Sequence, residues 1–219
     1  IGYGIFFQRI CFNEVNLTYE IVLVNDGSTD NSWEVLKSIA EKHSSVIAIN
    51  LSHNYGQQHA NLCGLKHSVG EWVVTMDDDL QNPPKEISKL IERSKSGATL
   101  IVGKFKQKKH PIYRRIGSYL FQKINRRIFQ TPINITLTNF RLIHRSVVDK
   151  ICECQAPFPY ISGLAVLFSH SIENVEVEHH SRQYSQSSYS FFRLLKLVYN
   201  VWFGYSAFPL RVVSVASGA

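Results

Sequence analysis

Cysteines are scarce in this sequence, with four in 219 residues, and only Cys152 and Cys154 lie close together. This number and spacing exclude a disulfide-stapled domain, and the Cys152-x-Cys154 pair lacks the second pair that a zinc site needs. No signal peptide opens the chain, and no run of about 18 uninterrupted apolar residues marks a membrane span. We therefore expect a protein of a reducing compartment whose membrane contact within this sequence is peripheral.

Acidic residues are absent over a long central stretch, because no Asp or Glu occurs from position 93 to 148. Lys and Arg recur there and are densest from Lys104 to Arg115. With a net charge of +7 and a pI near 9.2, this distribution favours an anionic partner such as nucleotide phosphate or anionic lipid. Solubility alone is the alternative explanation. Because no recognised nucleic-acid motif accompanies the basic stretch, we expect no nucleic-acid partner.

The hydrophobic content, 44% of the residues, is enough to bury a core in a chain of this length. Short apolar runs alternate with helical patterns before residue 103, which predicts an α/β fold with a mainly parallel sheet and flanking helices. The expected strands are 21–24, 46–49, 71–76 and 99–102. The expected helices are 31–42, a helix after the loop 54–58 that ends near Ser68, and 84–96.

Helical periodicity continues after Gly103, with apolar positions between clusters of positive charge. This face packs either on the core or on a membrane. The C-terminal stretch 189–211 mixes aromatic, aliphatic and cationic residues, a pattern typical of an amphipathic helix at a membrane interface. An ordinary packed helix is the alternative for that stretch.

Three consecutive carboxylates, Asp77, Asp78 and Asp79, follow the expected strand 71–76 directly. Ligands of open α/β sheets bind at the carboxyl ends of strands, and a divalent cation that bridges substrate phosphates needs only one or two carboxylates. Asp77 and Asp79 form an Asp-x-Asp pair suited to Mg²⁺ or Mn²⁺. A solvated acidic turn is the alternative, because the sequence Asn82-Pro-Pro84 also suits the start of a helix.

Three segments in this order resemble glycosyltransferase family 2: Val24–Asp30, Met76–Pro84 and Asn139–Asp149. Within that family the chain is similar to the polyprenyl-phosphate glycosyltransferases, the group that includes dolichol-phosphate mannose synthase. The similarity covers about residues 17 to 211. It implies a GT-A type, Rossmann-like fold for the α/β pattern described above.

The resemblance also implies a domain organisation. Residues 1–180 would form the GT-A catalytic domain, and residues 181–219 a donor-closing loop with amphipathic juxtamembrane helices. The family opens with a hydrophobic strand and a Pro-x-Tyr-Asn type motif, which this sequence lacks, so residues 1–19 are expected to be a remnant of the first helix. The stretch 208–219 stops where relatives begin transmembrane helices. Both ends are therefore expected to be cut.

Roles for individual residues follow from the same resemblance. Asp26 would help to hold the nucleotide base or ribose, Asp77 and Asp79 would flank Mg²⁺ or Mn²⁺ on the donor diphosphate, and Asp78 would face the nucleotide. The further donor-binding candidates are Gly56, Gln57, Arg182, Ser187, Ser188 and Tyr189. For Gly56 and Gln57 the alternative is a plain helix start, and for Arg182 a solvated surface charge.

The donor-closing segment departs from the family at two positions. Ser185 and Gln186 stand where the family often has Gly and then Lys. We expect this departure to weaken the grip on the donor diphosphate, whereas Arg182 could still bind two phosphate oxygens at once.

A general base is missing where some relatives carry an Asp, because this chain has Thr136, Thr138 and Asn139 there. Transfer to a hydroxyl usually requires such a base. A phosphate acceptor is already anionic near neutral pH and needs none. Arg141 and Arg145 would then position that phosphate and reduce its repulsion from the donor. The expected catalytic residues are Asp79, Arg141 and Arg182.

The leading hypothesis is an inverting, metal-dependent transferase that moves a sugar from a nucleoside-diphosphate sugar to a polyprenyl phosphate. It would work at the cytoplasmic face of the cell membrane, the bacterial inner membrane above all. A second hypothesis makes the acceptor a hydroxyl of a polysaccharide or lipopolysaccharide, which Asp149 or Glu153 reaching the site would favour. A third is a non-catalytic nucleotide-binding or membrane-associated module. The sugar, the nucleotide and any homo-oligomer are left open.

Overall fold

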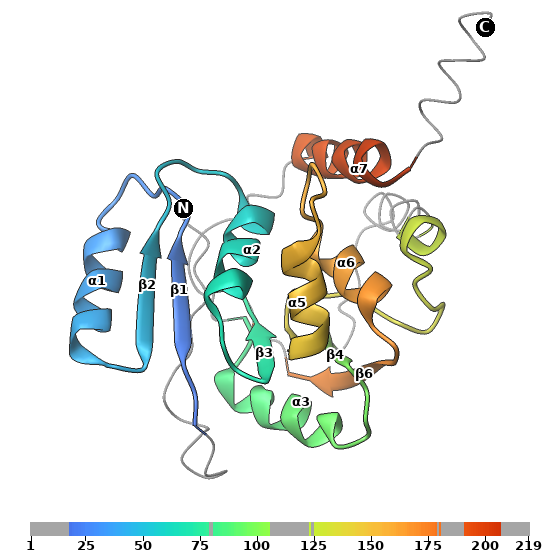
Figure 1. The fold of residues 1–219 in the computed structure, drawn as a ribbon, viewed down its shortest axis with the longest axis horizontal. Coiled ribbons are helices and arrows are strands. Elements are labelled where there is room, and N and C mark those ends of the chain that lie inside the picture. The colour runs from blue at the N-terminus through green and yellow to red at the C-terminus, as the bar shows by residue number, and fades with distance from the viewer. Residues whose placement is uncertain are drawn as a thin grey trace, which may run out of the picture.

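The computed structural model describes residues 18–78, 81–105, 123, 125–178, 180 and 191–206. Strands and helices alternate through its first half (Figure 1), and those predicted before residue 103 are all present. In chain order this half contains β1 (Ile21–Asn25), α1 (Ser32–Lys42), β2 (Val46–Asn50), α2 (Gln57–His67), β3 (Trp72–Thr75), the 3₁₀ turn η1 (Pro84–Glu86), α3 (Ile87–Ser94) and β4 (Leu100–Phe105).

The second half contains further strands and helices that had no individual sequence prediction, apart from the last helix. They are β5 (Arg141–His144), α5 (Arg145–Glu153), α6 (Ile161–Phe168), β6 (Ile172–Val177) and α7 (Phe191–Tyr205). The predicted remnant helix in 1–19 and the periodic stretch after Gly103 lie mostly outside the described residues. The predicted donor-closing segment, 179–189, lies outside them except for His180.

The described strands form two sheets. β1 pairs with β2 in parallel, and the second sheet has the order β3-β5-β4-β6. Within it β4 and β6 are parallel, whereas β5 runs antiparallel to both β3 and β4. The antiparallel direction brings the first residue of β5, Arg141, opposite Thr75 at the end of β3. The segment before β5 therefore lies at the edge where β3 ends.

The sheet of β1 and β2 is sandwiched between two helices (Figure 1). Alternate side chains of a strand point to opposite faces. Ile21 and Leu23 accordingly pack with Leu36 of α1, whereas Val22 and Val24 pack with Ala60 of α2. Both faces of β1 are thus covered, which explains its continuous apolar run.

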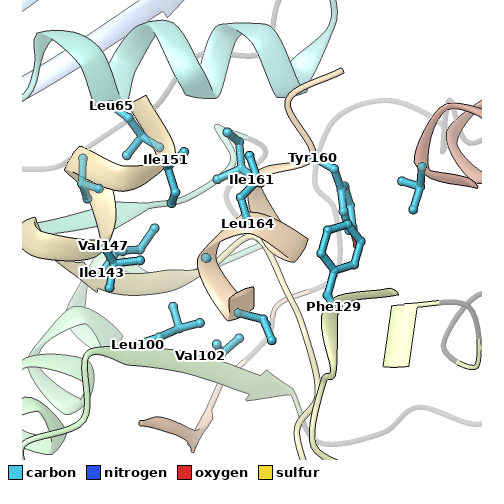
Figure 2. Close-up of a cluster of buried hydrophobic side chains, with 14 residues drawn as sticks. Leu65, Leu100, Val102, Phe129, Ile143, Val147, Ile151, Tyr160, Ile161 and Leu164 are labelled. Atoms are coloured by element: carbon cyan, nitrogen blue, oxygen red, sulfur yellow. The ribbon is translucent and has the colours of Figure 1, made fainter. Parts of the chain in front are cut away.

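The four-stranded sheet shows the same alternation. Leu100 and Val102 of β4 join the cluster under α5 and α6 that Figure 2 shows. Ile101, between them, joins a second cluster on the opposite face with Leu90 of α3. Burying each large aliphatic side chain contributes about 1.5–3 kcal/mol, so these two clusters fix the positions of the strand ends that the site uses.

The C-terminal helix α7 packs on this core through one face. Val201 is buried in the main cluster, and the Tyr205 hydroxyl donates to the carbonyl of Phe158. Burial raises the pKa of Tyr205 to about 12. The other face of α7 carries exposed Trp202 and Phe203. In the described part of the chain, no helix combines the length and the apolar character that crossing a bilayer requires.

Candidate active site

The carboxylate of Asp77 lies just beyond the carboxyl end of β3 and is held by two side-chain amides. Gln57 Nε2 and Asn139 Nδ2 each donate to Asp77 Oδ1 at 2.6 Å. Gln57 is the first residue of α2, and Asn139 lies two residues before β5. Three segments distant in the sequence therefore meet at one carboxylate oxygen. The predicted candidates Asp77 and Gln57 are brought together, and Asn139 is a site residue that the sequence prediction did not include.

The amide oxygen of Asn139 in turn accepts hydrogen bonds from two neighbouring side chains. Its Oδ1 accepts from Arg141 Nη2 at 3.0 Å and from Asn61 Nδ2 at 3.1 Å. The hydroxyl of Thr75 donates to the Asn139 carbonyl at 2.7 Å. Because Asn61 and Thr75 are both almost fully buried, this support is shielded from water.

Arg141 has a placement that differs from the predicted one. Its side chain is only 1% exposed, and its guanidinium also donates to Thr75 Oγ1 at 3.1 Å and to Ser162 Oγ at 2.7 Å. The predicted contact with an acceptor phosphate does not fit this burial. Burial lowers the pKa of Arg141 to about 10, so the guanidinium stays protonated at neutral pH. It therefore acts only as a donor.

Asp26 has protein contacts that the sequence did not predict. It is fully buried, and its two carboxylate oxygens accept the backbone N–H groups of Tyr55 and Gly56, both at 2.8 Å. The Asn54 side chain donates to its backbone carbonyl at 2.9 Å. Through these bonds to both of its oxygens, Asp26 holds the loop before α2 in place. Gly56 lies in this loop with a positive φ of 91°.

Gly27 allows this loop to approach β1 closely. It adopts a φ of +62°, and a Cβ there would lie 2.4 Å from the backbone carbon of His53 and 2.6 Å from the backbone N of Asn54. Glycine is the residue that meets both demands, a left-handed conformation and no side chain. The segment Asp26-Gly27 thus fixes the loop that leads to Gln57.

The donor set suits a hard divalent cation. Asp77 and Asp78 are partly exposed carboxylates at the end of β3, and Mg²⁺ is commonly bound through one or two carboxylates together with substrate phosphates. Over the residues that the structure describes, no group of three or more His, Cys, Asp or Glu side chains could hold a metal without further ligands. Asp79, the other predicted metal ligand, lies outside those residues.

The predicted donor-closing residues also lie outside the described part of the chain: Arg182, Ser187, Ser188 and Tyr189. The segment that leads to them is tied to the acidic loop. The N–H of His180 donates to the Gln81 carbonyl at 2.9 Å, and the N–H of Glu178 donates to the buried carboxylate of Glu86 at 2.9 Å. The chain therefore leaves β6 beside the acidic loop.

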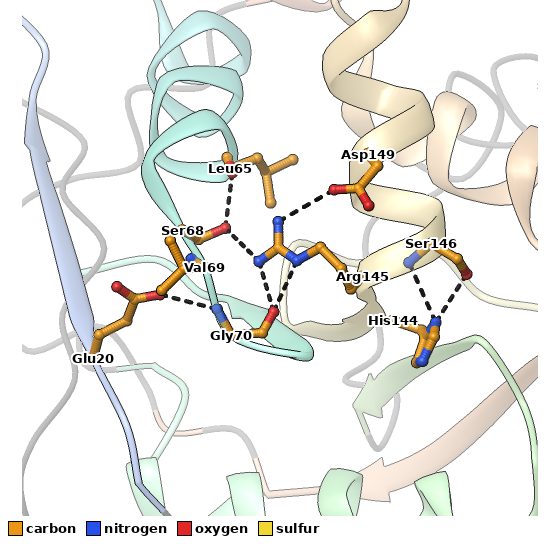
Figure 3. Close-up of polar contacts among 9 residues, drawn as sticks. All are labelled: Glu20, Leu65, Ser68, Val69, Gly70, His144, Arg145, Ser146 and Asp149. Carbon is orange, nitrogen blue, oxygen red and sulfur yellow. Dashed lines mark hydrogen bonds and ion pairs between the residues drawn. The ribbon is translucent and has the colours of Figure 1, made fainter.

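Arg145 lies at the other end of β3, away from Asp77, because its neighbour His144 pairs with Trp72. Figure 3 shows the contacts of its guanidinium. Its guanidinium donates twice to the Gly70 carbonyl, at 2.6 and 2.9 Å, and once to Ser68 Oγ at 3.2 Å. Asp149 lies 3.5 Å from Arg145 Nη1. The predicted role of Arg145 in holding an acceptor phosphate does not fit these contacts, and Asp149 is occupied away from Asp77.

Known proteins resemble this chain in sequence and in fold. The model of the family described as Glycosyl transferase family 2 matches residues 10–152. The undecaprenyl-phosphate 4-deoxy-4-formamido-L-arabinose transferase of Klebsiella pneumoniae (strain 342) is 32% identical over 198 residues, which cover 90% of this chain and 61% of that protein. The protein of the same name from Pseudomonas aeruginosa (strain LESB58) is 35% identical over 206 residues, 94% of this chain and 61% of that protein.

The chain spans 61% of the length of these curated relatives. Among solved structures, residues 1–349 of S. aureus TarS in complex with UDP align with a TM-score of 0.53 at 15% identity, over 88% of this chain and 60% of that one. At this identity the likeness concerns the fold alone, which is the predicted GT-A type. The family-model match and the sequence relatives together show that this chain belongs to glycosyltransferase family 2.

Proposed function

We propose that the protein transfers a sugar from a nucleoside-diphosphate sugar to a polyprenyl phosphate, with inversion at the anomeric carbon. The observation that carries this proposal is the Asp77 carboxylate at the carboxyl end of β3, oriented by the amides of Gln57 and Asn139. Strand ends of this kind are where α/β sheets bind nucleotides. The names of the relatives, both undecaprenyl-phosphate sugar transferases, support the choice of acceptor.

The acidic loop would hold Mg²⁺ or Mn²⁺ through Asp77 and Asp79, with Asp78 facing the nucleotide. Such a cation neutralises charge on the departing nucleoside diphosphate when it is bound. The protein's own task is to keep the Asp77 oxygens in one orientation, and the two amide donors serve that task. Arg182, Ser187, Ser188 and Tyr189 would add donors to the diphosphate from the segment that follows His180.

A phosphate acceptor agrees with the side chains around Asp77. Gln57 and Asn139 are amides, and neither can remove a proton from a hydroxyl. Asp149, whose approach to the site would have favoured a hydroxyl acceptor, is paired with Arg145 at the other end of β3. An acceptor phosphate needs no base, because its oxygen is anionic before it attacks.

A transfer assay tests this function directly. Labelled sugar would be offered from a panel of nucleoside-diphosphate sugars to undecaprenyl phosphate in detergent, with Mn²⁺, with Mg²⁺ and with a chelator. We expect labelled lipid from at least one donor, and only when a divalent cation is present. Labelling of an oligosaccharide hydroxyl in place of the lipid, or transfer that persists in the chelator, would contradict the proposal.

The lipid acceptor requires contact with a membrane surface, which we propose to be the cytoplasmic face of the cell membrane. The exposed aromatic rings of α7, Tyr199, Trp202 and Phe203, suit the interfacial zone of a bilayer. Tyr199 and Phe203 are neighbours, with ring centroids 4.3 Å apart. Because α7 is fixed to the core through Val201, these rings would orient the whole domain on the lipid.

Replacing Trp202 and Phe203 together by serine is therefore expected to weaken binding to anionic vesicles. Partial burial of each ring contributes about 1 kcal/mol or more, so the double variant should bind roughly 10- to 100-fold more weakly. Vesicle sedimentation would measure this change. The control is Val35→Ser, which removes an exposed apolar side chain from α1. Equal vesicle binding by the α7 variant and this control would exclude α7 as the anchoring surface.

A further inference from the structure

We infer that Arg141 is a positioning residue that orients the Asp77 carboxylate through Asn139. The two steps of this relay are the bond from Arg141 Nη2 to Asn139 Oδ1, 3.0 Å, and the bond from Asn139 Nδ2 to Asp77 Oδ1, 2.6 Å. The inference rests on the proposed function for its consequence in catalysis. The orientation itself can be tested without that function.

The N–H donor of Arg141 that faces Asn139 determines which way the Asn139 amide points. An arginine side chain has donors and no acceptor, so the atom of Asn139 that faces it must be the carbonyl oxygen. Asn61 Nδ2 donates to the same oxygen at 3.1 Å, in agreement with this orientation. The NH₂ group is thereby directed at Asp77, where only a donor is useful to a carboxylate.

Arg141 can serve as a fixed reference because three elements hold it. Its Nε donates to Thr75 Oγ1 on β3, its Nη1 donates to Ser162 Oγ on α6, and its own backbone belongs to β5. Thr75 also donates to the Asn139 carbonyl at 2.7 Å, so the backbone and the side chain of Asn139 are both restrained. Losing any of these hydrogen bonds leaves a buried polar group without its partner, which destabilises the fold.

Residues that orient a metal ligand without binding the metal themselves have measurable effects on metal sites. Removing a group that orients a metal ligand typically weakens metal binding or activity about 10- to 100-fold. Lysine at position 141 would keep the positive charge and lose the planar fork that reaches Thr75, Ser162 and Asn139 together. We therefore expect Arg141→Lys to release the Asn139 amide even where the fold survives.

The first test compares crystal structures of the wild-type protein, Arg141→Lys and the matched control Arg145→Lys. Arg145 lies four positions after Arg141 and donates to Gly70 at the other end of β3. Its variant therefore changes an arginine contact with the β3 region and leaves the bonds among Arg141, Asn139 and Asp77 intact. We expect the 2.6 Å bond between Asn139 and Asp77 to be lost in Arg141→Lys and kept in Arg145→Lys. An unmoved Asp77 carboxylate in Arg141→Lys overturns the inference.

The second test is a double-mutant cycle with Asn139→Ala, at a partly exposed position where truncation is tolerated more easily. Binding of Mn²⁺ in the presence of UDP, followed by electron paramagnetic resonance, would report on Asp77. If Arg141 acts through Asn139, the Mn²⁺ affinity of each single variant should fall about 10- to 100-fold. The affinity of the double variant should fall no further than that of the weaker single variant. Losses that multiply in the double variant would overturn the relay.

The two tests separate this inference from the proposed function. A wild-type protein that transfers no sugar from any donor would refute the function. Displacement of Asp77 in the Arg141→Lys crystal structure would still support the relay. Active protein with an undisturbed Asp77 in that variant would refute the relay and leave the function standing.

Discussion

Asp77→Asn is expected to reduce the rate of sugar transfer about 100- to 1000-fold while leaving the fold intact, because a metal bound to the departing diphosphate contributes several kcal/mol to the transition state. The substitution removes the negative charge and places an NH₂ group or a neutral oxygen against the donors of Gln57 and Asn139. Metal affinity and amide orientation should both suffer. Initial rates at saturating donor and Mn²⁺, with a circular dichroism spectrum for the fold, measure the effect.

The control for this variant is Asp30→Asn, the same substitution outside the site. Asp30 precedes α1, where its carboxylate accepts the N–H of Ser32 at 3.0 Å. Hydrogen bonds from the side chain of Ser32, and then from its backbone, lower the pKa of Asp30 below its ordinary value. We expect the control to transfer sugar at nearly the wild-type rate. If Asp77→Asn kept more than about a tenth of the wild-type rate, a metal-binding role for Asp77 would be wrong.

Gly27→Ala is expected to destabilise the protein by about 2–5 kcal/mol, the sum of a left-handed conformation and a steric overlap. The new Cβ would lie 2.4 Å from the backbone carbon of His53, and backbone atoms cannot rotate away as a side-chain end can. The loop from His53 to Gly56 must then move. Its two N–H bonds to Asp26 would be lost together. Urea unfolding followed by fluorescence would measure the change.

Gly97→Ala is the matched control for Gly27→Ala. Gly97 also has a positive φ, +86°, but nothing lies within 4 Å of its Cβ position. Gly97→Ala should therefore lower the free energy of unfolding only by the cost of the left-handed conformation, about 1–2 kcal/mol. The difference between the two variants isolates the close approach of Gly27 to the loop. Equal losses would show that this approach does not contribute to stability.

The first half of the fold could be predicted because its signals are local. The apolar runs 21–24 and 46–49 became β1 and β2 almost residue for residue, and α1 ends at the predicted Lys42. The strand β5 offered no such signal. It is four residues long and begins with Arg141, whose charge suggests solvent until its partners are known. Its antiparallel direction depends on long-range pairing that no local pattern encodes.

The sequence predicted a shared site for Asp77 and Gln57, but not the side chains that support Asp77. The position of Asp77 after an apolar run and the candidacy of Gln57 both followed from the sequence, and the two side chains do meet. Arg141 was expected to bind the acceptor phosphate because a sequence shows which residues are charged but not which of them are buried. Asn139 was noted only as the replacement for a carboxylate. The nearest signal for its role was its place at the start of the third family segment, beside Arg141.

The antiparallel position of β5 also has a consequence for the order of folding. Asn139 and Asp77 are 62 residues apart in the sequence, whereas the paired ends of β1 and β2 are 25 residues apart. Closing the larger loop costs more entropy, and such contacts tend to form late. We expect pulse-labelled hydrogen exchange to protect β1 and β2 before β3 and β5. A half-folded chain would then already carry its carboxylates but not their fixed orientation, so catalytic competence would be acquired in the last steps of folding.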